Sequence, residues 1–256
     1  GPDFSRPGPL PFVNDAEGRP LAANPFLDAR VRRALMLAIN REALAERAMD
    51  GLAVPAGQWM PRGAFGYDPA TPVPAFDPEG ARRLLAEAGF PNGFRMTLHT
   101  MNDRFPNDAR IAQAVAQMWS RIGVQTQVEA LPWTTYSARA ARQEFSMSMG
   151  SWGSTTGEGL SFAKSVLATF DRERRTGPAN HRRHSAPEFD AMLARAETIM
   201  DDAAREAAIA ELVRWSAENE PMIPLLHLSN VWAHRRGLRH EPRMDERTLA
   251  MGVRAQ

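Results

Sequence analysis

The chain has 256 residues, of which 43% are hydrophobic and 24% charged, a composition that suffices for a buried core and permits one long domain. Its 31 basic and 30 acidic residues leave a formal net charge of +1, so no overall field favours nucleic acid or an anionic membrane. The absence of cysteine excludes disulfides, thiolate catalysis and thiolate metal sites. No apolar run approaches the roughly 20 residues of a membrane-spanning helix, and no signal peptide opens the chain.

The first part of the chain is predicted to hold an arm, a helix and an apolar loop. Residues 1–26 are rich in proline and predict an extended surface arm, with the natural N-terminus expected further upstream. Asp28 is the predicted N-cap of a helix that keeps an apolar stripe over residues 31–44. Basic residues off that stripe, Arg41 among them, are interpreted as a solvated face. Residues 52–76, with five prolines and several aromatic residues, predict an ordered loop and not a linker.

The middle of the chain alternates predicted helices and strands. In order they are a helix from Pro78 capped by Asp77, strand 94–100, helix 108–122, strand 124–131, a short helix near 133–143 and strand 145–150. This βαβαβ order is typical of a mostly parallel sheet flanked by helices, so the predicted fold class is α/β. The last third predicts two helices, starting near Ser185 and Asp201, then a strand or strand pair within 221–234 and an irregular arginine-rich tail.

Polar and aromatic residues follow two of these strands, at the edge where parallel sheets usually bind ligands. Arg104 lies in the turn after strand 94–100, where a guanidinium could hold a carboxylate through two parallel hydrogen bonds. The loop GSWGSTTGEG, residues 150–159, follows strand 145–150 and carries Trp152 and Glu158. An aromatic wall, a cation and an anion at one rim would suit a zwitterionic ligand. The alternatives stay open that Arg104 is a solvated loop residue and that Trp152 is a core residue covering the sheet.

A second pattern suggests metal chemistry. HRRH places His181 and His184 three residues apart, a spacing that on a helix could bind a metal with a carboxylate such as Asp190. The surrounding segment is rich in helix breakers and predicts a loop, and the chain has no HExxH motif, no GxSxG elbow and no phosphate-binding loop. A metal-dependent hydrolase is therefore the alternative from another functional class.

Several stretches, in collinear order over nearly the whole chain, resemble the extracellular solute-binding proteins of family 5, the peptide and nickel receptors of ABC importers. They are DARVRRALMLAINREAL (28–44), AGQWMP (56–61), DPEGARRLLAEAGFPNG (77–93), the run 110–153, HSAPEFDAMLARA (184–196) and MIPLLHLSNVWA (222–233). The resemblance implies a periplasmic-binding-protein type II-like lobe, and only the C-terminal lobe of a two-lobed receptor. Residues 1–230 would form this ligand-binding lobe. Residues 231–256 would cross back to the first lobe, and without that lobe we expect them to be disordered or packed non-natively.

The same resemblance implies a receptor without enzymatic activity or cofactor. It would be a monomer in the periplasm or a cell-surface lipoprotein, capturing a small peptide or peptide-like solute for an ABC permease in the inner membrane and binding no nucleic acid. A receptor for nickel, haem or another non-peptide solute is the alternative within this class.

The ligand-contacting residues that the resemblance implies are Arg104, Trp152, Gly153, Thr155 and Glu158. Arg104 resembles the arginine that dipeptide-type members use for the ligand carboxylate, and Trp152 matches their strand-end tryptophan. Those members place an aspartate three residues after the tryptophan to bind the ligand's amine, where this sequence has Thr155. Glu158 is the candidate to replace that charge, so a modified peptide, a γ-glutamyl compound or a non-peptide ligand stays open.

Overall fold

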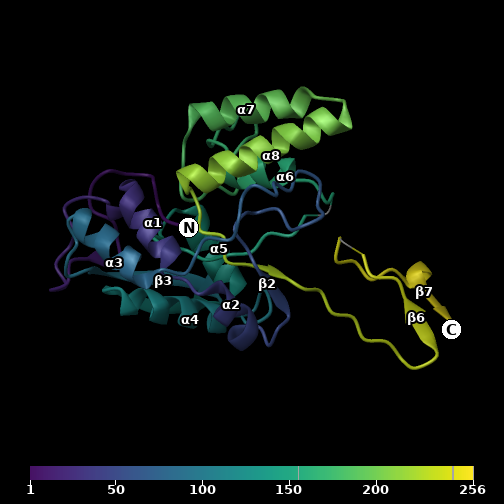
Figure 1. Ribbon diagram of the computed structural model, residues 1–256, viewed down its shortest axis with the longest axis horizontal. Helices are drawn as coiled ribbons and strands as arrows, with labels where there is room; N and C mark the ends of the chain where they lie inside the picture. Colours follow the sequence, from purple (N-terminus) through teal and green to yellow (C-terminus); the bar gives the residue numbers. More distant parts are fainter. Residues whose placement is uncertain (155, 244, 256) are drawn as a thin grey trace.

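The computed structural model of the protein describes residues 1–154, 156–243 and 245–255. Figure 1 shows a body of helices and strands from which the C-terminal segment projects as an arm. The strands are β1 (Val13–Asn14), β2 (Ala53–Pro55), β3 (Phe94–Met101), β4 (Val124–Leu131), β5 (Leu226–Leu228), β6 (Leu238–His240) and β7 (Val253–Ala255). The main helices are α1 (Ala29–Leu37), α3 (Pro78–Glu87), α4 (Asp108–Arg121), α5 (Trp133–Ala141), α7 (Pro187–Thr198) and α8 (Asp202–Asn219). Shorter helical turns are Pro25–Leu27, α2 (Arg41–Ala43), Leu44–Ala48, α6 (Leu160–Phe162), Ala163–Leu167 and Ala250–Gly252.

The predicted α/β class is confirmed by the central sheet. β3 and β4 pair in parallel along their whole length, with α4 as the connection between them. The third predicted strand is reduced to a short parallel segment, in which Met147 and Met149 exchange backbone hydrogen bonds with His99 at 3.0 and 2.9 Å. Residues 1–3 of the N-terminal arm pair with the other edge of this segment, and β1 pairs antiparallel with the start of β3.

Two glycines determine where β3 and β4 begin. Gly93 and Gly123 have φ angles of 69° and 97°, in the left-handed region that favours glycine. A Cβ atom on Gly93 would lie 1.9 Å from the carbonyl oxygen of Gly123, so the two backbones touch. This close approach places Phe94 opposite Val124 as the first pair of the parallel ladder.

The two faces of the sheet pack against different helices. Phe94 and Leu98, which point to the same face of β3, lie in the main core with residues of α1, α3 and α4. On the opposite face, Met101 packs with Tyr136 of α5 and with Phe145. The sheet is therefore flanked by helices on both faces, as predicted.

The predicted first helix is divided, although its start is where the sequence indicated. Asp28 caps α1 by accepting a hydrogen bond from the N–H of Arg30 at 2.8 Å. The Asn40 side chain then caps α2 by accepting from the N–H of Ala43 at 2.8 Å, so α1 ends at Leu37 and a new turn begins.

The prediction that Arg41 is solvated is wrong. Arg41 is 1% exposed, because the chain leading into β5 crosses the face on which it lies. Its Nε donates to the carbonyl of Pro224 at 2.9 Å, and its Nη1 donates to the carbonyls of Met36 and Ile39 at 3.3 Å. Arg41 thus joins the end of α1 to the start of β5.

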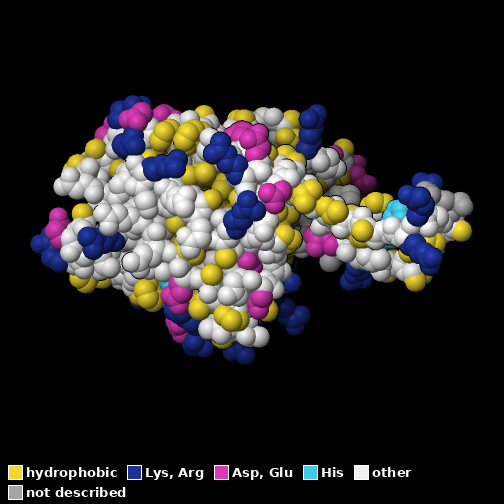
Figure 2. All heavy atoms as spheres, turned by 90° about the horizontal axis from the view of Figure 1, so that it is seen from below, with side chains coloured by type: hydrophobic (Ala, Val, Ile, Leu, Met, Phe, Trp, Pro, Cys, Tyr) yellow, Lys and Arg dark blue, Asp and Glu magenta, His cyan; other side chains and the backbone are white. Residues whose placement is uncertain are grey.

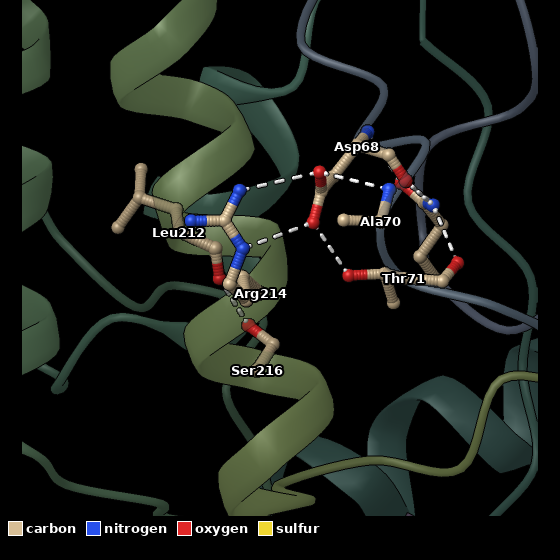
Figure 3. A network of polar contacts seen from close by, with 7 residues as sticks. Asp68, Ala70, Thr71, Leu212, Arg214 and Ser216 are labelled. Atoms are coloured by element: carbon tan, nitrogen blue, oxygen red, sulfur yellow. Dashed lines mark hydrogen bonds and ion pairs between the residues drawn. The ribbon is translucent and has the colours of Figure 1, made fainter.

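A second core lies between α7, α8 and α6, which Figure 1 shows above the sheet. The predicted ordered loop, residues 52–76, connects the two cores: its β2 pairs with β5, and Asp68 contacts α8. Figure 3 shows the Asp68 carboxylate accepting hydrogen bonds from Arg214 of α8 at 3.3 Å and from the Thr71 hydroxyl at 2.7 Å.

The C-terminal segment projects from this body and approaches it again at Gly153, where a Cβ atom would lie 3.5 Å from a carboxylate oxygen of Glu246. β6 and β7 pair with each other and form their own two-stranded sheet. Figures 1 and 2 show this arm projecting from the body, and basic and acidic side chains are interspersed on the face seen in Figure 2. None of the described helices combines the length and apolarity that crossing a membrane requires. The role of residues 231–256 as a crossing segment stays a prediction.

Candidate functional site

The loops predicted to bind a ligand emerge at one edge of the sheet. β3 ends at Met101 and β4 ends at Leu131, its direct partner in the parallel ladder. The third segment, paired with His99 of β3, ends at Met149. Because parallel strands end at the same edge, residues 102–107, the start of α5 and residues 150–154 all follow strand ends there.

Arg104 lies exposed in the loop after β3 and stacks on a tryptophan that the sequence analysis missed. Its guanidinium carbon is 5.4 Å from the ring centre of Trp133, a cation–π geometry. Asp103 fixes this arrangement by accepting a hydrogen bond from the Trp133 backbone N–H at 2.7 Å, and Asp108 accepts from the Arg104 N–H at 3.1 Å. The available signal for Trp133 was its position directly after strand 124–131, at the same sheet edge as Arg104.

Trp152 lies at the surface, which excludes the alternative that it is a core residue. Its side chain is 44% exposed and meets the ring of Phe162 edge-on, with centroids 5.8 Å apart. Phe162 in turn stacks on Trp59, with ring centroids 5.1 Å apart. The indole of Trp152 thus packs against one of two stacked aromatic rings. Trp152 therefore has an aromatic support and an open face available for a ligand.

Glu158 is already paired in this structure. Its two carboxylate oxygens accept hydrogen bonds from Nη2 of Arg205 on α8 at 2.8 and 3.0 Å. The Arg205 and Glu158 side chains are partly exposed, at 29% and 25%, and the pair joins the loop to the helix. A ligand amine would have to compete with Arg205 for this carboxylate.

The other two predicted site residues lie on the same loop. Gly153 is exposed, and a Cβ atom placed on it would lie 3.5 Å from a carboxylate oxygen of Glu246 in the C-terminal arm. Thr155 lies outside the described residues. The ligand contacts predicted for these positions stay predictions.

The residues proposed for metal chemistry have structural partners instead. The ring of His184 packs edge-on against Phe4 at 5.3 Å, and burial lowers the pKa of this imidazole. Asp190 accepts a hydrogen bond from the Thr169 N–H at 2.9 Å. Across residues 1–154, 156–243 and 245–255, no group of three or more His, Cys, Asp or Glu side chains is placed to hold a metal ion. His181 and His184 are thus not part of such a group.

A cavity of about 300 Å³ lies elsewhere, between residues 57–74 and α8. Trp59, Arg214 and Met222 are among its lining residues, and Arg104, Trp152 and Glu158 are not. At the predicted rim the side chains of Arg104 and Trp152 are exposed, as expected for one jaw of a site that needs a second jaw to enclose a ligand.

Comparison with known proteins identifies relatives, which the chain matches over part of their length. The family described as bacterial extracellular solute-binding proteins, family 5 Middle, matches residues 10–173, which is more than half of the chain. The chain is 32% identical over 227 residues to the glutathione-binding protein GsiB of Shigella flexneri, covering 84% of this chain and 42% of that protein. It is 29% identical over 206 residues to heme-binding protein A of Haemophilus influenzae, covering 79% of this chain and 37% of that protein.

Solved structures confirm the fold. HbpA2 from Haemophilus parasuis matches 98% of this chain and 49% of its own, with a TM-score of 0.77 and 25% identity. A dipeptide-binding protein from Pseudoalteromonas sp. SM9913, in complex with Met-Leu, matches 97% of this chain and 49% of its own, with a TM-score of 0.76 and 21% identity. The chain spans about half the length of these proteins, and it belongs to the bacterial extracellular solute-binding proteins of family 5.

Proposed function

We propose that this protein is the substrate-binding component of an ABC importer and captures a peptide or peptide-like solute for delivery to a membrane permease. The observation that carries the proposal is the rim of the sheet, where the exposed guanidinium of Arg104 and the open face of Trp152 follow adjacent parallel strands. Arg104 would hold the carboxylate of the ligand, and Trp152 would form a wall against its apolar part.

The chain would supply one of two lobes that close on the ligand. Support comes from the length of the relatives, of which this chain spans half or less, and from the exposure of Arg104 and Trp152 at the rim. Closure would exclude water and strengthen the few charged contacts, so binding would need no chemical step. Such a receptor would be a monomer in the periplasm or anchored at the cell surface, with the permease as its partner.

A haem or other planar solute is the second candidate. Two exposed indoles, Trp133 at 42% and Trp152 at 44%, lie at the rim and would also stack on a planar ring. The likeness to heme-binding protein A adds to this candidate. A Soret absorbance change on titration of the two-lobed protein with hemin would distinguish it from the peptide receptor.

The test of the main proposal uses the two-lobed protein that contains this chain. Mass spectrometry of co-purifying small molecules identifies the ligand, and calorimetry then measures its affinity. Since each charge-assisted hydrogen bond contributes about 1.5–3 kcal/mol, Arg104→Met should weaken binding by roughly 10- to 100-fold. Arg121→Met is the matched control, because Arg121 is exposed at the far end of α4, beside the start of β4.

The isolated 256-residue chain should bind the same ligand with a Kd of about 1 mM or weaker, since half of the contacts are absent. Micromolar binding by this chain alone, or unchanged affinity in the Arg104→Met receptor, would contradict the proposal.

A further inference from the structure

The cavity of about 300 Å³ beside α8 lies where the two cores of the protein meet. Three segments line it: α1 of the main core, residues 57–74 of the ordered loop, and the stretch from Val213 on α8 to Pro224. Figure 3 shows the loop facing α8 across the pair of Asp68 and Arg214. Small-molecule sites are common at such junctions between packed units.

The loop that forms one wall is held in a single shape. A Cβ atom on Gly57 would lie 2.2 Å from the carbonyl oxygen of Pro72, so the two sides of the loop touch. The buried amide of Gln58 donates to the carbonyls of Asp68 at 2.7 Å and Thr71 at 3.2 Å, and accepts from the Asp68 N–H at 3.0 Å. This wall is therefore formed before any ligand arrives, which lowers the cost of binding.

Two guanidiniums contribute positive charge to the wall. Arg33 donates through Nη1 to Glu220 at 3.1 Å, and Arg214 donates through Nε and Nη2 to Asp68 at 3.3 Å. Both arginine side chains are about half exposed, at 47% and 48%, whereas their carboxylate partners are 7% and 4% exposed and do not line the cavity. The lining residues carry these two positive charges and one negative charge, that of Glu218, so they sum to +1. Since a guanidinium has five N–H donors, each arginine keeps donors for an anion.

Most of the remaining wall is apolar, with Met36, Trp59, Met222 and Pro224 among its residues. Trp59 is fixed by stacking on Phe162, with ring centroids 5.1 Å apart. Small-molecule sites have volumes of about 300–1,000 Å³ and combine an apolar wall with a few polar groups. A cavity at the lower end of this range suits a ligand of one or two rings.

We propose that this cavity is a second binding site, separate from the rim, for a small aromatic carboxylate. Its ring would pack against Trp59 and the two methionines, and the guanidiniums of Arg33 and Arg214 would attract its carboxylate. The site does not depend on the proposed function, because neither Arg104 nor Trp152 lines the cavity.

The first test titrates the 256-residue chain with indoleacetate and follows the methionine methyl signals by NMR. The signals of Met36 and Met222, assigned by their loss in Met36→Leu and Met222→Leu, should shift saturably with a Kd of about 0.1–1 mM. Met200 is the internal control, because it is 88% exposed and lies outside the cavity. Cavity methyl signals that shift no more than that of Met200 would overturn the proposal.

The second test fills the cavity from α8. Ala217 lines it, so Ala217→Phe should weaken indoleacetate binding by about ten-fold or more. Ala207→Phe is the matched control, since Ala207 is exposed on the same helix and its replacement should leave the Kd unchanged. Unchanged affinity in a folded Ala217→Phe chain would place indoleacetate elsewhere and refute the site.

The ligand's charge is tested with tryptamine, which has the same ring but a cationic side chain. It should bind about ten-fold more weakly than indoleacetate, and equal affinity would refute the assignment to carboxylates. The titration is then repeated on the two-lobed protein carrying Arg104→Met, so that the rim does not contribute. Retained methyl shifts support a site in the whole receptor, and their loss would show that the first lobe closes the cavity and would overturn the proposal.

Discussion

Arg41 offers the sharpest test of how this lobe is stabilised. It is 1% exposed and lacks a carboxylate partner among the described residues, yet three carbonyl oxygens accept its hydrogen bonds. Two of these carbonyls, of Met36 and Ile39, lie at the end of α1, and the third belongs to Pro224 before β5. Burial lowers the pKa of Arg41 to about 10, which reflects the cost of desolvating the cation. We predict that Arg41→Met destabilises the chain.

The magnitude follows from two opposing effects. Methionine leaves the buried carbonyls of Pro224 and Ile39 without a donor, while the Met36 carbonyl keeps the Ile39 N–H as a donor at 3.5 Å. Each unpaired group costs about 1–3 kcal/mol, with the lower end appropriate for the long bond of 3.3 Å to Ile39. The substitution also removes a buried cation, one of whose nitrogens, Nη2, has no partner, and this relief offsets about 1 kcal/mol. The expected net loss is about 1–3 kcal/mol in the free energy of unfolding. Arg41→Lys should cost at least as much, since an ammonium cannot replace the planar fork.

Urea unfolding measures this effect through the transition midpoint, which should fall by about 1 M for a loss of this size. Arg62→Met is the control, because Arg62 is exposed and its replacement should change stability by no more than about 0.5 kcal/mol. Amide exchange in β5 should also accelerate in Arg41→Met, since Pro224 would lose its anchor. A midpoint equal to or above that of the native chain would refute the assignment of Arg41 as a stabilising donor.

Two further predictions concern carboxylates. Burial would raise the pKa of Asp68, but hydrogen bonds from Thr71 and Arg214 hold it below 3.8. Its stabilising contribution is therefore present above pH 3.8 and is lost as the pH falls below that value. Asp68→Asn should lower the free energy of unfolding by about 1–2 kcal/mol near pH 7. The difference between the variant and the native chain should shrink as the pH is lowered to 3. A difference that stays constant over this range, measured by urea unfolding, would contradict the assignment. Glu158→Gln should cost about 0.5–1 kcal/mol in stability, because it weakens a partly exposed pair with Arg205. In the two-lobed receptor it should leave ligand affinity within about three-fold, and a loss of 10-fold or more would show that Glu158 binds the ligand amine.

Local signals in the sequence predicted most of the regular elements. Asp28 and Asp77 cap helices as predicted, accepting hydrogen bonds from the N–H groups of Arg30 and Gly80 at 2.8 Å. The strand predicted over 124–131 has those bounds in the structure. These features depend on neighbours within a few residues, and capping and alternation report such neighbours directly.

Features that depend on distant segments were predicted less well. The third strand forms only a short segment, because β1 pairs with the first half of β3 and the third strand pairs only near its end. The short strand β2 was missed, since its partner β5 lies far along the chain and no local turn joins them. At the candidate site, the order of the strands predicted which loops lie at the rim. It did not predict the ion pair of Glu158 with Arg205, because the two residues lie in separate elements.

The arginines of this chain show why residue type and local pattern cannot by themselves assign a charged site. Arg41 and Arg104 each have an acidic neighbour in the sequence, Glu42 and Asp103, and helical periodicity placed Arg41 on a solvated face. In the fold, Arg41 has buried carbonyls as partners and Arg104 stacks on an indole. What distinguishes them is the balance between lost hydration and gained partners, and tertiary contacts alone determine that balance. By this reasoning a substitution at Arg41 should destabilise the chain, and a substitution at Arg104 should weaken ligand binding.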